Sequence, residues 1–185
     1  MPPPSASLDL SIGASAAPAA SATSVTDVVV WDLPLRVFHW ALVALVSTAV
    51  TTGLLGGAWM TWHARAGQAI GALLVFRLGW GLWGSRYARF AQFWPSPSRV
   101  WAYLRGRWHA LGHNPLGALS VFAILVLLTA QVLTGLLGND EIGFAGPWSG
   151  WVEEDTSLKL TGWHRLASKL LYVWFALHLL AVGVY

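Results

Sequence analysis

Four long apolar stretches, separated by polar or turn-forming residues, dominate the pattern of this chain. Each is close to the roughly 20 apolar residues that a helix needs to cross a bilayer. The pattern therefore predicts an all-α membrane protein, built as a bundle of four transmembrane helices. The expected spans are about 35–56, 63–84, 116–137 and 162–185. Together with a short lead-in they form one membrane domain over residues 28–185.

The segments between these spans differ in composition. Residues 1–27 are rich in Ala, Ser and Pro without Lys or Arg, so we expect a disordered tail and not a secretory signal. The loop 85–113 has five arginines and no acidic residue, and aromatic side chains near its middle predict a short amphipathic segment on the membrane surface. Pro34 and Pro115, the latter after Asn114, fit the first turns of two helices.

Charge predicts the orientation, because loops rich in Lys and Arg stay on the cytoplasmic side of a membrane. The basic loop 85–113 is therefore expected in the cytoplasm, and the acidic, turn-rich loop 138–161 outside. With four spans, the N-terminus then lies in the cytoplasm.

Composition supports a membrane protein and limits its chemistry. The chain is 56% hydrophobic and only 10% charged, well below the roughly 25% charged residues of soluble domains. It has 13 tryptophans, a residue that favours membrane interfaces. The absence of cysteine excludes disulfides, iron–sulfur clusters and covalently attached haem. The arginines flank the spans, so nucleic acid is not an expected partner.

Histidines near the ends of the spans sort into two depths. His39 begins the first span near the cytoplasmic side, and His63 begins the second near the outer side. In the fourth span, the spacing from His164 to His178 corresponds to about 1400° of rotation and about 21 Å of rise, so both point to nearly the same side. We call His63 and His164 the outer pair, and His39 and His178 the inner pair.

Two imidazoles at one depth can hold a haem iron from both sides, which gives a six-coordinate centre suited to electron transfer. The pattern thus predicts two non-covalent haem b groups between the first, second and fourth spans. The expected metal ligands are His39, His63, His164 and His178. The Nδ1–H group of each ligand should donate to a carbonyl and fix the ring.

Cationic side chains near each predicted haem are candidates to bind its propionates. They are Arg77 on the inner side, and Arg65, Arg165 and Lys169 on the outer side. Arg77 has the alternative of pairing with backbone carbonyls. His109 and His113 lie in the polar loop, and we expect neither to be a ligand.

Two other interpretations stay open at this point. A haem-free four-helix membrane anchor or small transporter would use the histidines as proton relays or packing groups, and would not require matched depths. A single-haem protein would fill only one pair. The number of haems per chain separates these interpretations from the dihaem one.

Several stretches of the chain resemble the prokaryotic cytochrome b561 family, which includes the b-type cytochrome subunits of nickel–iron hydrogenases. The stretches are residues 31–40, 76–90 and 112–117, and the segment from Trp163 through His178. In that family, the first and second helices give one histidine each and the fourth gives two. The resemblance implies the same four ligands that the depths predict.

The resemblance also implies a function. It indicates a dihaem b-type cytochrome of the bacterial inner membrane that moves electrons across the bilayer between the quinone pool and a redox partner. The partner expected is a hydrogenase, a dehydrogenase or a c-type cytochrome, and a homodimer is left open. Because no catalytic residue can be named, we expect an electron-transfer subunit of an oxidoreductase system more than a self-contained enzyme.

Overall fold

The computed structural model describes residues 31–107 and 114–184, so the expected tail and the loop histidines His109 and His113 lie outside the described residues. Within that part of the chain all regular structure is helical, apart from an isolated bridge between Asn139 and Ala145. This confirms the all-α prediction for the described part. The α-helices are α1 (Leu33–Leu55), α2 (Met60–Trp83), α3 (Pro97–Leu104), α4 (Pro115–Leu137) and α5 (Glu154–Val184).

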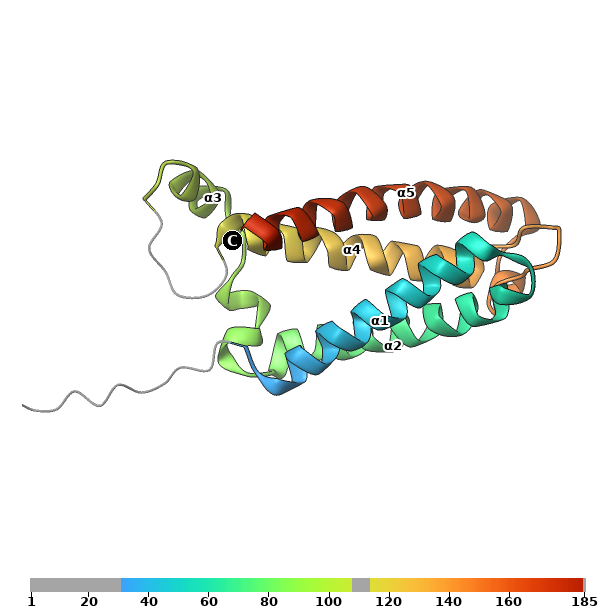
Figure 1. Cartoon of the computed structure of the whole chain (residues 1–185), viewed down its shortest axis with the longest axis horizontal. Coiled ribbons are helices and arrows are strands. Elements are labelled where there is room, and N and C mark those ends of the chain that lie inside the picture. Colours follow the sequence, from blue (N-terminus) through green and yellow to red (C-terminus); the bar gives the residue numbers. More distant parts are fainter. Residues whose placement is uncertain (1–30, 108–113, 185) are drawn as a thin grey trace, which may run out of the picture.

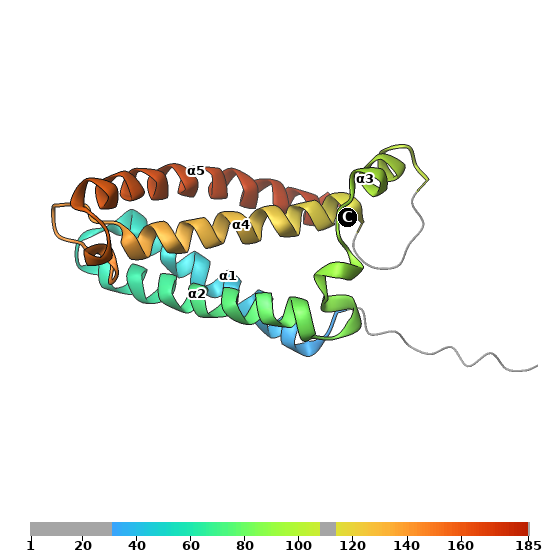
Figure 2. The ribbon, with the colours of Figure 1, turned by 180° about the vertical axis from the view of Figure 1, so that it is seen from behind.

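The four long helices form two hairpins, α1–α2 and α4–α5, that lie side by side (Figures 1 and 2). Helices α2 and α4 pack against each other between the hairpins. Their contact forms a small apolar core from Ile70, Leu74, Leu125 and Leu128, joined by Leu171 of α5. The short helix α3 lies apart, at the end of the bundle where α5 finishes (Figure 1). We call this end the α3 end, and the opposite one the loop end.

Much of the apolar surface of the long helices faces outward, as lipid contact requires. Val126 of α4 is 69% exposed and Val173 of α5 is 61% exposed. Among the described helices α1, α4 and α5 are long and apolar enough to cross a membrane. Helix α2 packs along α1 and matches it in length, but it carries Arg77 and Gln68 and is less apolar. That α2, the second expected span, also crosses the membrane therefore stays a prediction.

Local capping explains where two of these helices begin. The Asp32 side chain accepts a hydrogen bond from the Leu35 N–H at 2.9 Å, and Pro34 occupies the first turn of α1 as predicted. Asn114 accepts from the Gly117 N–H at 2.6 Å ahead of α4, which confirms the expected cap. Such caps satisfy backbone donors that a helix start leaves free. The predicted amphipathic segment is the helix α3.

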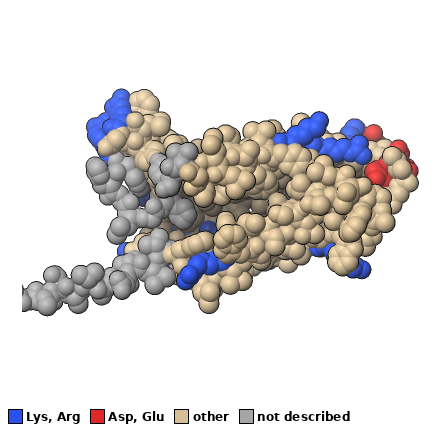
Figure 3. All heavy atoms as spheres, viewed as in Figure 1, with Lys and Arg blue, Asp and Glu red and all other residues tan. Residues whose placement is uncertain are grey.

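The expected start of the fourth span is wrong for the helix itself, because α5 begins at Glu154 and not near Gly162. Glu154 and Asp155 lie in its first turn, where carboxylates interact favourably with the helix dipole. Asp155 pairs with Lys159 one turn later. Residues assigned to an acidic loop thus form the first turns of α5. On the face shown in Figure 3, acidic side chains gather at this loop end.

Gly81 of α2 allows the chain after α2 to fold back closely against the helix. A Cβ atom at this position would overlap the ring of Phe90. That ring also lies 4.5 Å from Cζ of Arg77. The glycine therefore lets the Phe90 ring pack against α2, where the ring stacks with the guanidinium of the buried Arg77.

Gly81→Ala is expected to destabilise the protein by about 1–3 kcal/mol, the usual cost of overpacking. Thermal unfolding of the detergent-solubilised protein measures this. Gly79→Ala is the matched control, because a Cβ atom there would meet nothing within 4 Å. In this control the protein is expected to gain about 0.5–1 kcal/mol of stability, because alanine is a better helix former than glycine. Equal melting temperatures for the two variants would contradict the packing argument.

Candidate functional site

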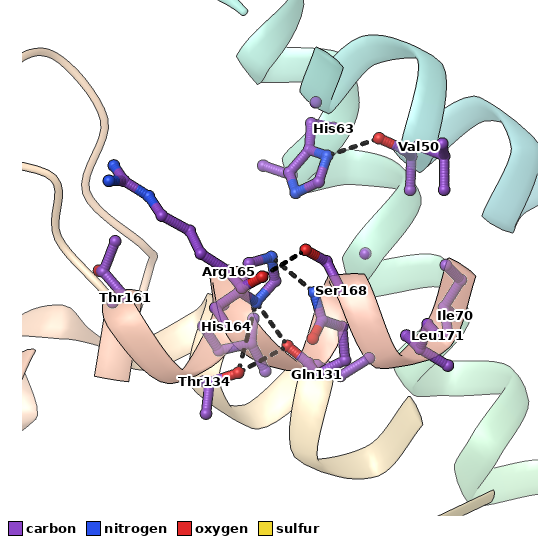
Figure 4. A pocket seen from close by; sticks show the side chains of 18 of the residues that line it. Val50, His63, Ile70, Gln131, Thr134, Thr161, His164, Arg165, Ser168 and Leu171 are labelled. Carbon is purple, nitrogen blue, oxygen red and sulfur yellow. Dashed lines mark hydrogen bonds between the residues drawn. The ribbon is translucent and has the colours of Figure 1, made fainter. Parts of the chain in front are cut away.

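A cavity of about 590 Å³ opens between the four long helices toward the loop end. Its volume lies in the range of roughly 300–1,000 Å³ that is typical of cofactor pockets. Most of the lining is apolar, and the polar lining side chains include His63, Gln131 and His164. Figure 4 shows His63 facing His164 across this space, the two coming from different hairpins.

The structure brings the outer pair together. The ring centroids of His63 and His164 are 5.9 Å apart, and the rings are nearly perpendicular. Two imidazoles that bind one metal from opposite sides, at about 2.0–2.1 Å per nitrogen, have centroids roughly 6 Å apart. The separation of the two rings is therefore suitable for one shared metal.

Both imidazoles of the outer pair have their Nδ1 atom on a backbone carbonyl of the preceding long helix. Nδ1 of His63 lies 2.8 Å from the Ala49 carbonyl oxygen, and Nδ1 of His164 lies 3.0 Å from that of Gln131. This is the carbonyl contact that we expected for metal-binding histidines. Nε2 of His164 faces the Gln131 side-chain amide nitrogen at 3.0 Å. The amide oxygen of Gln131 is buried and has no hydrogen-bond partner within residues 31–107 and 114–184.

Of the cations predicted for the outer side, two line the cavity. Arg165 and Lys169 are lining residues, one and five positions after His164 in α5. Arg65 is not among the lining residues, and its guanidinium lies 5.1 Å from the ring centroid of Trp62. Asp140 also lines the cavity. Hydrogen bonds from the backbone N–H groups of residues 142–144, with Arg165 nearby, hold the pKa of the Asp140 carboxyl below its ordinary value.

The inner pair lies at the α3 end. His39 and His178 are close enough to interact electrostatically, but no hydrogen bond joins them. The His39 ring makes edge contacts with Trp31 and Trp40, at centroid distances of 5.9 and 5.4 Å. Its Nδ1 atom is buried and has no hydrogen-bond partner among the described residues. His178 is exposed. A buried polar atom without a partner is uncommon in folded proteins.

Arg77, the cation predicted for the inner side, is buried, with 5% of its surface exposed. Its Nη1 donates to the Ala88 carbonyl oxygen at 3.4 Å, and its guanidinium lies over the Phe90 ring. The structure therefore shows the carbonyl pairing that the sequence left as an alternative for this residue. A role toward a cofactor stays a prediction.

Sequence reasoning missed the polar residues of α4, since that span lacks histidine and charge. Gln131 and Thr134 both contact His164, at 3.0 Å and 3.3 Å. The signal was a repeat: the pattern Val-x-Thr-Gly-Leu-Leu-Gly occurs at residues 50–56 and again at 132–138. Asp32 was also missed, although an aspartate two residues before a proline at the start of an apolar run is a typical cap.

Comparison with known proteins gives a consistent result. Residues 30–185 match the model of the family described as prokaryotic cytochrome b561. The probable Ni/Fe-hydrogenase 1 B-type cytochrome subunit of Escherichia coli (strain K12) is 22% identical, over 77% of this chain and 76% of that protein. The probable Ni/Fe-hydrogenase B-type cytochrome subunit of Azotobacter chroococcum is 26% identical, over 83% and 79%.

The corresponding protein of Cupriavidus necator is 28% identical, over 90% of this chain and 81% of that protein. No solved structure matches the chain significantly. The family model covers all of the described residues, including both histidine pairs. This chain therefore belongs to the prokaryotic cytochrome b561 family.

Proposed function

We propose that this protein is a dihaem b-type cytochrome that moves electrons across the bacterial inner membrane, between the quinone pool and a redox partner. The observation that carries the proposal is the outer pair, two facing imidazoles whose Nδ1 atoms both lie on carbonyls. Family membership and relatives named as B-type cytochrome subunits support a haem protein. The names of these relatives favour a nickel–iron hydrogenase as the partner.

The residues of the outer site fit a haem b group. His63 and His164 would hold the iron, while Arg165 and Lys169 at the cavity would bind the propionates. When bound, haem supplies reversible one-electron chemistry, and two histidine ligands leave no open position for oxygen. The apolar lining would exclude water from the bound metal and help to set its reduction potential.

The inner site rests on fewer contacts. His39 and His178 would hold the second iron, and the unpartnered Nδ1 of His39 is consistent with a site that a cofactor completes. Arg77 is a buried cation at this end, and it would serve a propionate by leaving the Ala88 carbonyl. With the basic loop in the cytoplasm, the inner site lies on the cytoplasmic side and the N-terminus is cytoplasmic.

Haem content tests the proposal directly. The full chain, expressed in a bacterial membrane and purified in detergent, should show b-type absorption and two haems per chain by the pyridine haemochrome assay. A redox titration should then resolve two midpoint potentials. A colourless protein would overturn the proposal in favour of a haem-free anchor or transporter, and a single haem would reduce it to one site.

A further inference from the structure

The repeated pattern noted above ends two helices that do not carry the outer ligands. Residues 50–56 form the end of α1, and residues 132–138 form the end of α4. In each hairpin the next long helix carries one member of the outer pair, His63 on α2 and His164 on α5. The same short sequence therefore precedes each outer ligand, once in each half of the bundle.

The two copies hold their imidazoles in the same way. In each, a carbonyl oxygen contacts Nδ1 of the histidine, from Ala49 at 2.8 Å and from Gln131 at 3.0 Å. In each, a glycine four residues later gives the ring its space. A Cβ atom on Gly53 would lie 2.9 Å from Nδ1 of His63, and one on Gly135 would lie 3.0 Å from Cε1 of His164. Carbonyl and glycine share one helix face because their spacing is about one turn.

A threonine precedes the glycine in both copies and makes equivalent bonds. Thr52 Oγ1 donates to the Thr48 carbonyl oxygen at 2.6 Å, and Thr134 Oγ1 donates to that of Ala130 at 2.7 Å. The single hydroxyl proton of Thr134 is thus used within its own helix. Its oxygen, 3.3 Å from Nδ1 of His164, is left as an acceptor.

These contacts determine which ring nitrogen carries the proton. A carbonyl oxygen only accepts, so Nδ1 of both rings must be the donor, and Nε2 keeps the lone pair that a metal needs. The Gln131 amide donates to Nε2 of His164, which is compatible with that tautomer alone. Nε2 therefore carries a lone pair in both halves of the site, and on His164 the Gln131 amide holds that lone pair and must move aside for a metal.

We propose that the repeated segments form two equivalent seats, Ala49 with Thr52 and Gly53 on α1, and Gln131 with Thr134 and Gly135 on α4, which fix both outer imidazoles as metal-ready Nδ1–H tautomers. Gly53, Thr134 and Gly135 are positioning residues that act through the histidines. The α4 seat is the more polar one, because Gln131 replaces Ala49. The two seats deepen the proposed function, and the tests that measure haem rest on that proposed function.

Glycine substitutions test the seats. Gly53→Ala and Gly135→Ala should each push the imidazole off its carbonyl and weaken outer haem binding roughly 10–100-fold, the usual effect of lost outer-sphere support. The purified full chain should keep the inner haem, which reports that the variant has folded. Gly79→Ala is the control, since its Cβ would meet nothing within 4 Å. Two haems at wild-type occupancy in both seat variants would overturn the inference.

Threonine substitutions test the electronic effect without a change of shape. Thr134→Val removes an acceptor for Nδ1–H, so it should raise the outer midpoint potential, leave the inner one unchanged and retain both haems. Thr134→Ser should restore the wild-type potential. Thr129→Val removes a similar threonine bond of α4, to the Leu125 carbonyl, that contacts no histidine, and should change neither potential. A potential that Thr134→Val and Thr129→Val shift equally would overturn the role of Thr134.

The tautomers can be read separately from haem binding. In the full chain labelled with ¹⁵N-histidine, measured in the reduced, diamagnetic state or without haem, His63 and His164 should both show a protonated Nδ1 and an unprotonated Nε2. A protonated Nε2 on either ring would overturn the seats. A protein in which both rings are protonated at Nδ1 but which binds no haem would overturn the proposed function and leave the seats supported.

Discussion

His164→Ala is expected to leave one haem per chain, held by the inner pair, and to stop electron transfer across the membrane. His164 provides one side of the outer site, where it faces His63 at a centroid distance of 5.9 Å. An alanine leaves the remaining imidazole to hold the iron alone, within a cavity of about 590 Å³ whose lining is mainly apolar. Without a second ligand this non-covalent group has too few bonds to stay bound through purification.

The matched control lies in the same helix. His178→Ala removes the α5 ligand of the inner pair and should also leave one haem, but the other one. Pyridine haemochrome assays would count the haems, and redox titrations would show one midpoint potential in each variant. The two single potentials should together account for the wild-type curve. Two haems in His164→Ala, or identical potentials in both variants, would contradict the assignment of the pairs.

The sequence predicted the fold well where a local rule determines the structure. Pro34 and Asn114 have residue types that start helices, and α1 and α4 begin beside them. The start of α5 was wrong because acidic residues in a turn-rich stretch also suit a loop. In the structure Glu154 and Asp155 begin a helix that the tertiary contacts support, since Ser157 Oγ donates to the Leu137 carbonyl of α4 at 2.6 Å.

The close approach of His63 and His164 could be predicted because depth in a membrane follows from span direction. His63 and His164 are far apart in sequence, yet each lies near the loop end in the second helix of its hairpin. The partners of these rings could not be predicted in the same way. The Ala49 and Gln131 carbonyls belong to the backbone, which any residue supplies, so only the repeated sequence around them pointed to a shared geometry.

Asp32→Ala is expected to destabilise the protein by about 2–4 kcal/mol, more than the loss of an exposed carboxylate such as Asp155. Asp32 caps α1 through the Leu35 N–H, and its other oxygen accepts from Trp80 Nε1 at 3.0 Å and from Ser85 Oγ. It therefore ties the start of α1 to the end of α2. Arg77, buried nearby, loses a compensating charge in the same variant.

Two further variants separate these contributions. Asp32→Asn keeps an oxygen for the cap, but its amide N–H group faces the donors of Trp80 and Ser85. This variant should therefore lose about 1–2 kcal/mol of stability. Asp155→Asn is the matched control. Its pair with Lys159 is well exposed, with side chains 76% and 68% accessible, and such pairs contribute about 1 kcal/mol or less. Thermal unfolding in detergent compares all three, and equal losses at Asp32 and Asp155 would contradict the tie between α1 and α2.

The same carboxylate should make stability depend on pH. Burial raises the pKa of the Asp32 carboxyl, but hydrogen bonds from Ser85, Leu35 and Trp80, with Arg77 nearby, outweigh burial and hold that pKa below 3.8. A group with a lowered folded-state pKa stabilises the protein above its unfolded pKa and loses this contribution as the pH falls through the folded value. Wild type should therefore lose stability relative to Asp32→Asn on acidification below about pH 4. A difference between them that stays constant from neutral pH down to this range and below would show that the Asp32 carboxyl titrates alike in the folded and unfolded states, and that its contacts do not favour the charged form.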